Sequence, residues 1–139
     1  MATTVTADTI YQGSTIIVKK VYISSGAGDE TSTEVSIIDL STLLGPDGVN
    51  PPGKVSLMEA TWTMSPTFEY AKMYWHDEGN DAVILEMAGD SAVSFVGVGG
   101  LHYTTEAEAG DGDVLMDFTN ATEVAGVFDA TFVFKKKFT

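Results

Sequence analysis

Short β-prone runs, each ended by a turn signal, constrain this chain more than any other feature of its sequence. Val, Ile, Thr, Tyr and Phe dominate the runs, and clusters of Gly, Pro, Asp and Asn separate them at short intervals. These residue types favour strands and turns respectively. Because the three- and four-residue apolar spacing of a helix is scarce, the sequence predicts strands joined by turns.

Alternation of apolar and polar positions is clearest in the last two runs. In an extended strand, side chains two positions apart share a face. The last run places four apolar residues on one face: Phe128, Ala130, Phe132 and Phe134. The segment 114–119 does the same with Val114, Met116 and Phe118. Each segment therefore predicts a strand with one face in a core.

Eight segments carry strand patterns: 14–24, 32–40, 55–65, 67–76, 81–87, 92–96, 114–119 and the final apolar run. A helix would also fit segment 67–76, but Pro66 before it and the turn residues after it favour a strand. Eight strands at this spacing indicate an all-β antiparallel domain, a β-sandwich or jelly roll, rather than alternating βαβ units.

The chain divides into a polar start and one domain. Residues 1–13 are predicted to be a flexible N-terminal arm, and residues 14–139 a single domain without repeats or low-complexity tracts. With 44% apolar residues in 139, a packed core is feasible. The first residues lack a secretory signal, so we expect a protein made in the cytoplasm.

Charge and composition exclude several classes of function. Seven lysines and no arginine stand against 20 Asp plus Glu, which gives a net charge of −13. Phosphate binding needs clustered Lys or Arg, so no nucleic-acid partner is expected. No stretch approaches the roughly 20 apolar residues of a membrane helix, so no membrane partner is expected either. Without cysteine, the chain has no disulfide, thiolate metal site or cysteine nucleophile.

Catalytic motifs are also missing from the sequence. His76 and His102 lie in separate segments, and no nucleophile elbow, His-Glu-x-x-His pair or phosphate-binding loop occurs. The Gly-rich run 96–100 resembles a bend or bulge in a sheet. Acidic loops 77–81 and 106–113 could supply calcium ligands, but solvated turns explain them as well. We therefore predict no catalytic residue, cofactor or metal.

Segment 67–76 is apolar on both of its faces. Tyr70 and Tyr74 alternate with Met73 and Trp75 along it. Since a two-layer sandwich covers one face of each sheet, the surplus face predicts burial against a partner, most simply another copy of the chain. Half-exposed Tyr and Met side chains are the alternative. Exposed aromatics here would also fit a carbohydrate-binding module, although Trp62 falls in phase with core positions.

The C-terminal run concentrates three of the seven lysines, Lys135, Lys136 and Lys137. One interpretation is a docking strand that pairs with an acidic partner. The other is an edge strand or terminus whose lysines discourage unwanted strand pairing.

The stretch from Lys54 to Phe138, about 60% of the chain, resembles small structural proteins of tailed-bacteriophage virions, the capsid cement or decoration family. The resemblance lies in a suite of strands and turns: Lys54-Val55-Ser56-Leu57, Ala60-Thr61-Trp62, Met73-Tyr74-Trp75-His76-Asp77, Gly99-Gly100-Leu101, Gly112-Asp113-Val114-Leu115 and Lys135-Lys136-Lys137. No catalytic residue is carried over, because the shared positions are structural.

The resemblance implies a non-enzymatic protein on the capsid exterior that bridges neighbouring major capsid subunits, as a trimer or dimer with itself. A tail, baseplate or fibre component, or a module that binds carbohydrate or a cell surface, is the alternative. We expect the contacts to involve the C-terminal lysines, the loop 45–53, the arm and segment 70–75. The candidate interface residues are Tyr70, Met73, Tyr74, Trp75, Pro51, Pro52, Lys135, Lys136 and Lys137.

Overall fold

The structure is a computed structural model of the chain, and it describes residues 4–13, 15–25, 31–43, 54–66, 68–76, 82–101, 113–120 and 126–137. These residues form strands and two short 3-10 turns: β1 (Thr4–Gln12), β2 (Ile16–Ser25), β3 (Thr31–Ile38), η1 (Leu40–Thr42), β4 (Lys54–Met64), β5 (Phe68–Trp75), β6 (Ala82–Met87), β7 (Ser91–Ser94), η2 (Val96–Val98), β8 (Val114–Asn120) and β9 (Gly126–Lys137). No helix among them is long and apolar enough to cross a membrane.

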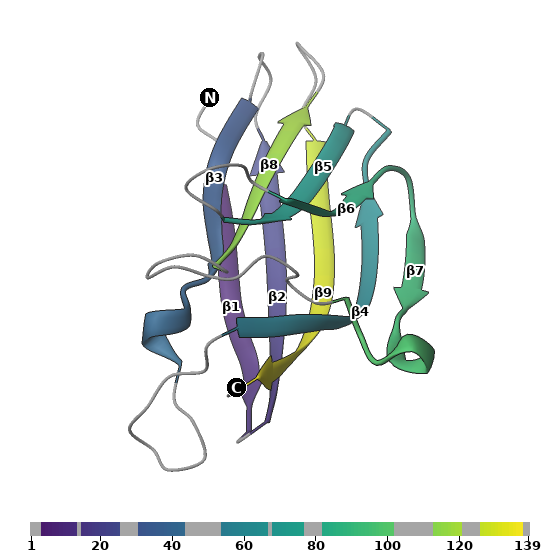
Figure 1. Cartoon of the computed structure of the whole chain (residues 1–139). Helices are drawn as coiled ribbons and strands as arrows, with labels where there is room; N and C mark the ends of the chain where they lie inside the picture. The colour runs from purple at the N-terminus through teal and green to yellow at the C-terminus, as the bar shows by residue number, and fades with distance from the viewer. Residues whose placement is uncertain are drawn as a thin grey trace.

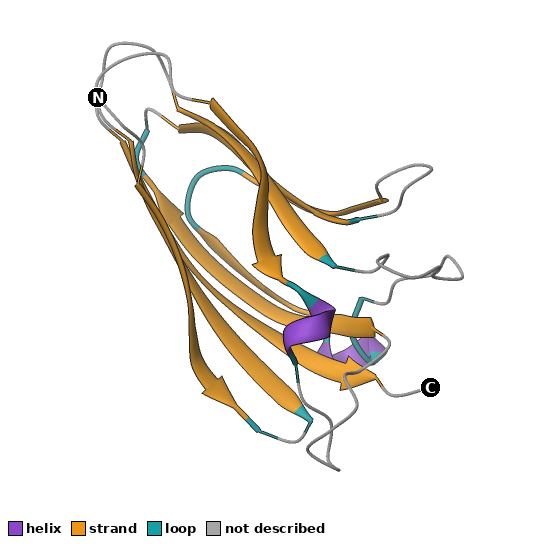
Figure 2. Ribbon diagram, turned by 90° about the vertical axis from the view of Figure 1, so that its left-hand side faces the viewer, coloured by secondary structure: helices purple, strands orange, loops and turns teal. Residues whose placement is uncertain are grey.

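Two antiparallel sheets make up the fold. The five-stranded sheet has the order β1-β2-β9-β4-β7, and the four-stranded sheet has the order β3-β8-β5-β6. Figure 2 shows the sheets as two layers that face one another. The prediction of an all-β sandwich is therefore confirmed, and segment 67–76 contributes a strand rather than a helix.

The core lies between the layers and is built from the alternating faces of the strands. On β9 the inward residues Phe128, Phe132 and Phe134 are completely buried, as are Met116 and Phe118 on β8. Burial of a large apolar side chain contributes about 1.5–3 kcal/mol relative to leaving it in water. The alternation in these two strands therefore predicted the core face correctly.

The C-terminal strand β9 lies in the middle of its sheet. It pairs with β2 on one side, from Ile16–Lys135 to Ser25–Gly126, and with β4 on the other. Of the two alternatives, an edge strand or a terminus, the edge strand is wrong for this lysine run, and the backbone of β9 is not open to a docking partner. Because both neighbours come from distant parts of the chain, the local lysine run gave no indication of them.

The predicted flexible arm is also wrong for residues 4–12. They form β1, which pairs with β2 from Thr4–Ser24 to Gln12–Ile17, with a register shift between Thr9 and Tyr11. Val5 and Ala7 pack against the core. The segment looked disordered because it is polar, but threonine and valine suit a strand whose neighbour supplies the hydrogen bonds.

Candidate interaction surfaces

The predicted apolar face of β5 is not a free surface. Met73 and Trp75 point into the core and are buried, and they lie opposite Met116 and Val114 of β8. Tyr74 lies on the other face but is only 3% exposed, and its hydroxyl donates to Asp117 Oδ1 at 3.0 Å. The prediction of a surplus apolar face is therefore wrong for these three side chains.

Tyr70 is the candidate interface residue of β5 that remains exposed, at 41%. The two tryptophans that could have formed a sugar platform, Trp62 and Trp75, are both buried. The indole Nε1 of Trp62 has no hydrogen-bond acceptor among the described residues. Pro51 and Pro52 lie outside the described residues.

The C-terminal lysines differ in their surroundings. Lys135 is exposed, whereas Lys136 is buried, and its Nζ donates to Gln12 Oε1 and to the carbonyl of Gly13, both at 2.9 Å. Burial lowers the pKa of the Lys136 ammonium below its ordinary value of 10.5. Lys137 pairs with Lys54 through its backbone, and its side chain lies outside the described part. Lys136 therefore ties β9 to the end of β1 and is not available as an interface residue.

A hydrogen-bonded turn presents two exposed valines at the edge of the five-stranded sheet. The Phe95 N–H donates to the carbonyl of Met58 on β4 at 2.8 Å, and the Gly100 N–H donates to the Phe95 carbonyl at 2.8 Å. These bonds join the two ends of the η2 turn and attach the turn to β4. Val96 is 55% exposed and Val98 is 75% exposed. The predicted bend at 96–100 is confirmed, and it presents an apolar tip.

Gly100 makes this turn possible because the backbone there has φ of +95°, a conformation that side-chain-bearing residues rarely adopt. The next residue, Leu101, exchanges backbone hydrogen bonds of 2.9 and 3.0 Å with Leu57. The chain thus leaves the edge of β4 after Phe95 and returns to it at Leu101. Backbone hydrogen bonds to β4 on both sides of the turn therefore position the segment that carries Val96 and Val98.

The opposite edge of the same sheet carries a second apolar patch. β1 pairs with β2 alone among the described strands, and Ile10 and Tyr11 at its register shift are each 58% exposed. Apart from Asp8, β1 has no charged residue, and it has neither the lysine nor the proline that commonly protects an edge strand. Figure 1 shows β1 and the η2 turn on opposite sides of the sheet.

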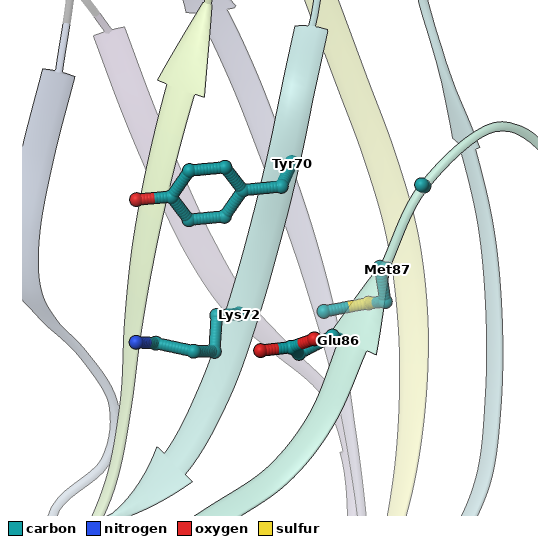
Figure 3. Close-up of a pocket in the computed structure, with 5 residues that line it drawn as sticks. Tyr70, Lys72, Glu86 and Met87 are labelled. Atoms are coloured by element: carbon teal, nitrogen blue, oxygen red, sulfur yellow. The ribbon is translucent and has the colours of Figure 1, made fainter.

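A hollow of about 530 Å³ lies on the outer face of the four-stranded sheet. Its lining comes from β5 and the end of β6: Tyr70, Lys72, Glu86, Met87 and Ala88. Lys72 stands directly opposite Glu86 of β6 and Asp117 of β8 in the sheet register. Figure 3 shows Tyr70 and Lys72 extending in the same direction from β5, with the Glu86 carboxylate beside Lys72.

The outer face of the five-stranded sheet carries charged and threonine side chains. Lys20 and Asp129 form an ion pair there at 3.5 Å. A hollow of about 150 Å³ beside them is lined mainly by threonine and charged side chains. On the inner face of β2, in contrast, Lys19 is partly buried. This burial lowers the pKa of its ammonium below 10.5, whereas the negative charge of Asp8 acts in the opposite direction and raises it.

The acidic and histidine candidates do not come together within the described residues. No group of three or more His, Asp or Glu side chains that could hold a metal occurs among them. Asp113 has a structural contact, since its Oδ1 accepts the Leu40 N–H at 2.9 Å. Its carbonyl accepts the His76 N–H at 2.8 Å. His102 and the rest of loops 77–81 and 106–113 lie outside the described part.

The residues that sequence reasoning missed are Ile10 and Tyr11, assigned to the arm, and Val96 and Val98, treated only as part of a bend. In both cases the sequence places two apolar residues close together where the chain departs from regular strand pairing. These positions are the register shift of β1 and the turn that follows β7. No protein-family model, curated protein or solved structure matches the chain.

Proposed function

We propose that the chain is a non-enzymatic structural protein of a tailed-bacteriophage virion, a capsid cement protein that bridges neighbouring major capsid subunits on the outside of the shell. One observation carries the proposal. Exposed apolar patches, Ile10 with Tyr11 and Val96 with Val98, lie at opposite edges of one sheet. The resemblance to the cement family, stated above, supports it.

Patches at opposite edges suit a bridge because each can meet a different neighbour. Five strands spaced roughly 4.8 Å apart separate the edges by about 19 Å. Each patch is small and would bind weakly alone, whereas two patches engaged together, repeated over many copies, give strong attachment by avidity. The same edges can join copies of the chain into a trimer or dimer.

The charge of −13 fits the same role. Free copies repel each other and the viral DNA, so they stay separate until a shell offers complementary apolar sites. A tail, baseplate or fibre component would use the same edges against a different partner. Identification of the partner therefore decides between these placements.

Sedimentation of the native protein from the lysate of its source, with mass spectrometry of the proteins that travel with it, tests the proposal. We expect the chain in a megadalton particle beside a major shell protein at comparable copy number. Migration with tail proteins would reassign the placement and contradict the cement role. A free species of one to three chains, with no particle, would contradict the virion proposal altogether.

A further inference from the structure

We propose that the hollow on the outer face of the four-stranded sheet is a binding site for a neutral carbohydrate, with Tyr70 as its stacking surface and Lys72 and Glu86 as its hydrogen-bonding groups. This site is independent of the assembly edges, because it lies on the other sheet. It would give the chain a glycan-binding activity in addition to its proposed structural role.

The shape and size of the hollow suit a sugar. Its volume of about 530 Å³ falls within the roughly 300–1,000 Å³ typical of small-molecule sites. Tyr70 is 41% exposed, so part of its ring is free to contact the apolar face of a pyranose. Lys72 extends beside the ring from the same strand, as Figure 3 shows.

The charges in and beside the hollow disfavour an anionic ligand. Lys72 brings one positive charge and Glu86 one negative charge, from opposite positions of paired strands. Asp117 lies on the far side of Lys72 in the register and accepts the Tyr74 hydroxyl. An anionic ligand would meet these two carboxylates and the overall charge of −13.

A sugar hydroxyl both donates and accepts hydrogen bonds, which matches this pair of groups. The Lys72 ammonium can only donate, and the Glu86 carboxylate can only accept. In the proposed complex, one hydroxyl of the sugar accepts from Lys72 and another donates to Glu86, while the apolar face of the ring lies on Tyr70. The strands hold the groups in place, because β5 is paired on both sides, with β6 and with β8.

Tyr22 provides a matched control for Tyr70. It is 40% exposed on β2, in the other sheet, and it does not line either of the hollows described above. A tyrosine that binds sugars merely because it is exposed would behave like Tyr22. A tyrosine that belongs to a site would not.

Saturation-transfer NMR with cellobiose, lactose, maltose and chitobiose as neutral probes, and 3′-sialyllactose as a charged probe, tests the site. We expect at least one neutral disaccharide to bind the full chain with a Kd on the order of 1 mM. Tyr70→Ala should abolish the signal, Glu86→Gln should weaken binding at least threefold, and Tyr22→Ala should leave it unchanged.

Three results would overturn the proposal. The first is that no neutral probe binds at a concentration 10-fold above the expected Kd. The second is an equal loss of binding in Tyr70→Ala and Tyr22→Ala. The third is tighter binding of 3′-sialyllactose than of lactose, its neutral parent. The unfolding midpoint of each variant is measured to determine whether it remains folded. Because Glu86→Gln preserves shape, it tests the site even if Tyr70→Ala alters the neighbouring surface.

Discussion

Replacement of Gly100 with alanine is expected to lower the free energy of unfolding by about 2–4 kcal/mol. An added Cβ would lie 2.6 Å from the Met58 sulfur and 3.3 Å from the Leu57 carbonyl oxygen. The backbone at this position has φ of +95°, which an alanine adopts only under strain. Urea unfolding, monitored by tryptophan fluorescence, measures this change in the free energy of unfolding.

Two other glycines separate the causes of this loss. At Gly89, φ is +64° but no atom lies within 4 Å of an added Cβ, so alanine should cost only the backbone strain of about 1–2 kcal/mol. At Gly97 the space is open and φ is not positive, so alanine should be neutral within about 0.5 kcal/mol. Equal losses at all three positions would contradict the described closure of the η2 turn on β4.

If the proposed cement role holds, the combined substitution Ile10→Asp with Val98→Asp should reduce binding of the purified chain to virions stripped of it by roughly a hundredfold or more. Each single change should weaken binding by roughly tenfold, because the other edge still holds one neighbour. Both side chains are exposed, so stability should change by less than about 0.5 kcal/mol. A pelleting assay at increasing chain concentration measures the affinities.

Val83→Asp is the matched control for each of the two single substitutions, because it adds one negative charge as they do. Val83 is 53% exposed on β6, an edge strand of the other sheet. The substitution places one new negative charge on a similarly exposed edge that lies outside the proposed contacts. Binding should therefore remain within about twofold of the unmodified chain. Equal weakening by Val83→Asp would show that added negative charge, rather than loss of the apolar patches, causes the effect.

The strands of this fold could be predicted wherever burial imposes a regular alternation. Phe128, Phe132 and Phe134 repeat every second position because β9 has one face in the core. β1 was missed because its exposed edge relaxes this requirement, so that threonine and aspartate replace apolar residues. Strand order depends on pairing between distant segments, which is why the central place of β9 could not be predicted from its own residues.

The candidate surfaces could be predicted only in part, for a related reason. Tyr70 and Tyr74 share one face of β5 in the sequence pattern, yet one is exposed and the other is buried with its hydroxyl on Asp117. Alternation identifies the face of a strand but not what covers it. Likewise, the lysine run in the sequence reveals a cluster of positive charge, but it does not reveal that Lys136 donates hydrogen bonds to Gln12 and Gly13.

Amide hydrogen exchange of the chain, free and bound to the virion of the proposed role, tests most directly whether the two edges of the five-stranded sheet make the proposed contacts. We expect slower exchange on binding at residues 7–12 of β1 and at residues 96–99 around η2, with residues 82–88 unchanged. Protection confined to β6 or to the outer faces of the sheets, with β1 and η2 exchanging as in the free chain, would contradict the proposed contacts.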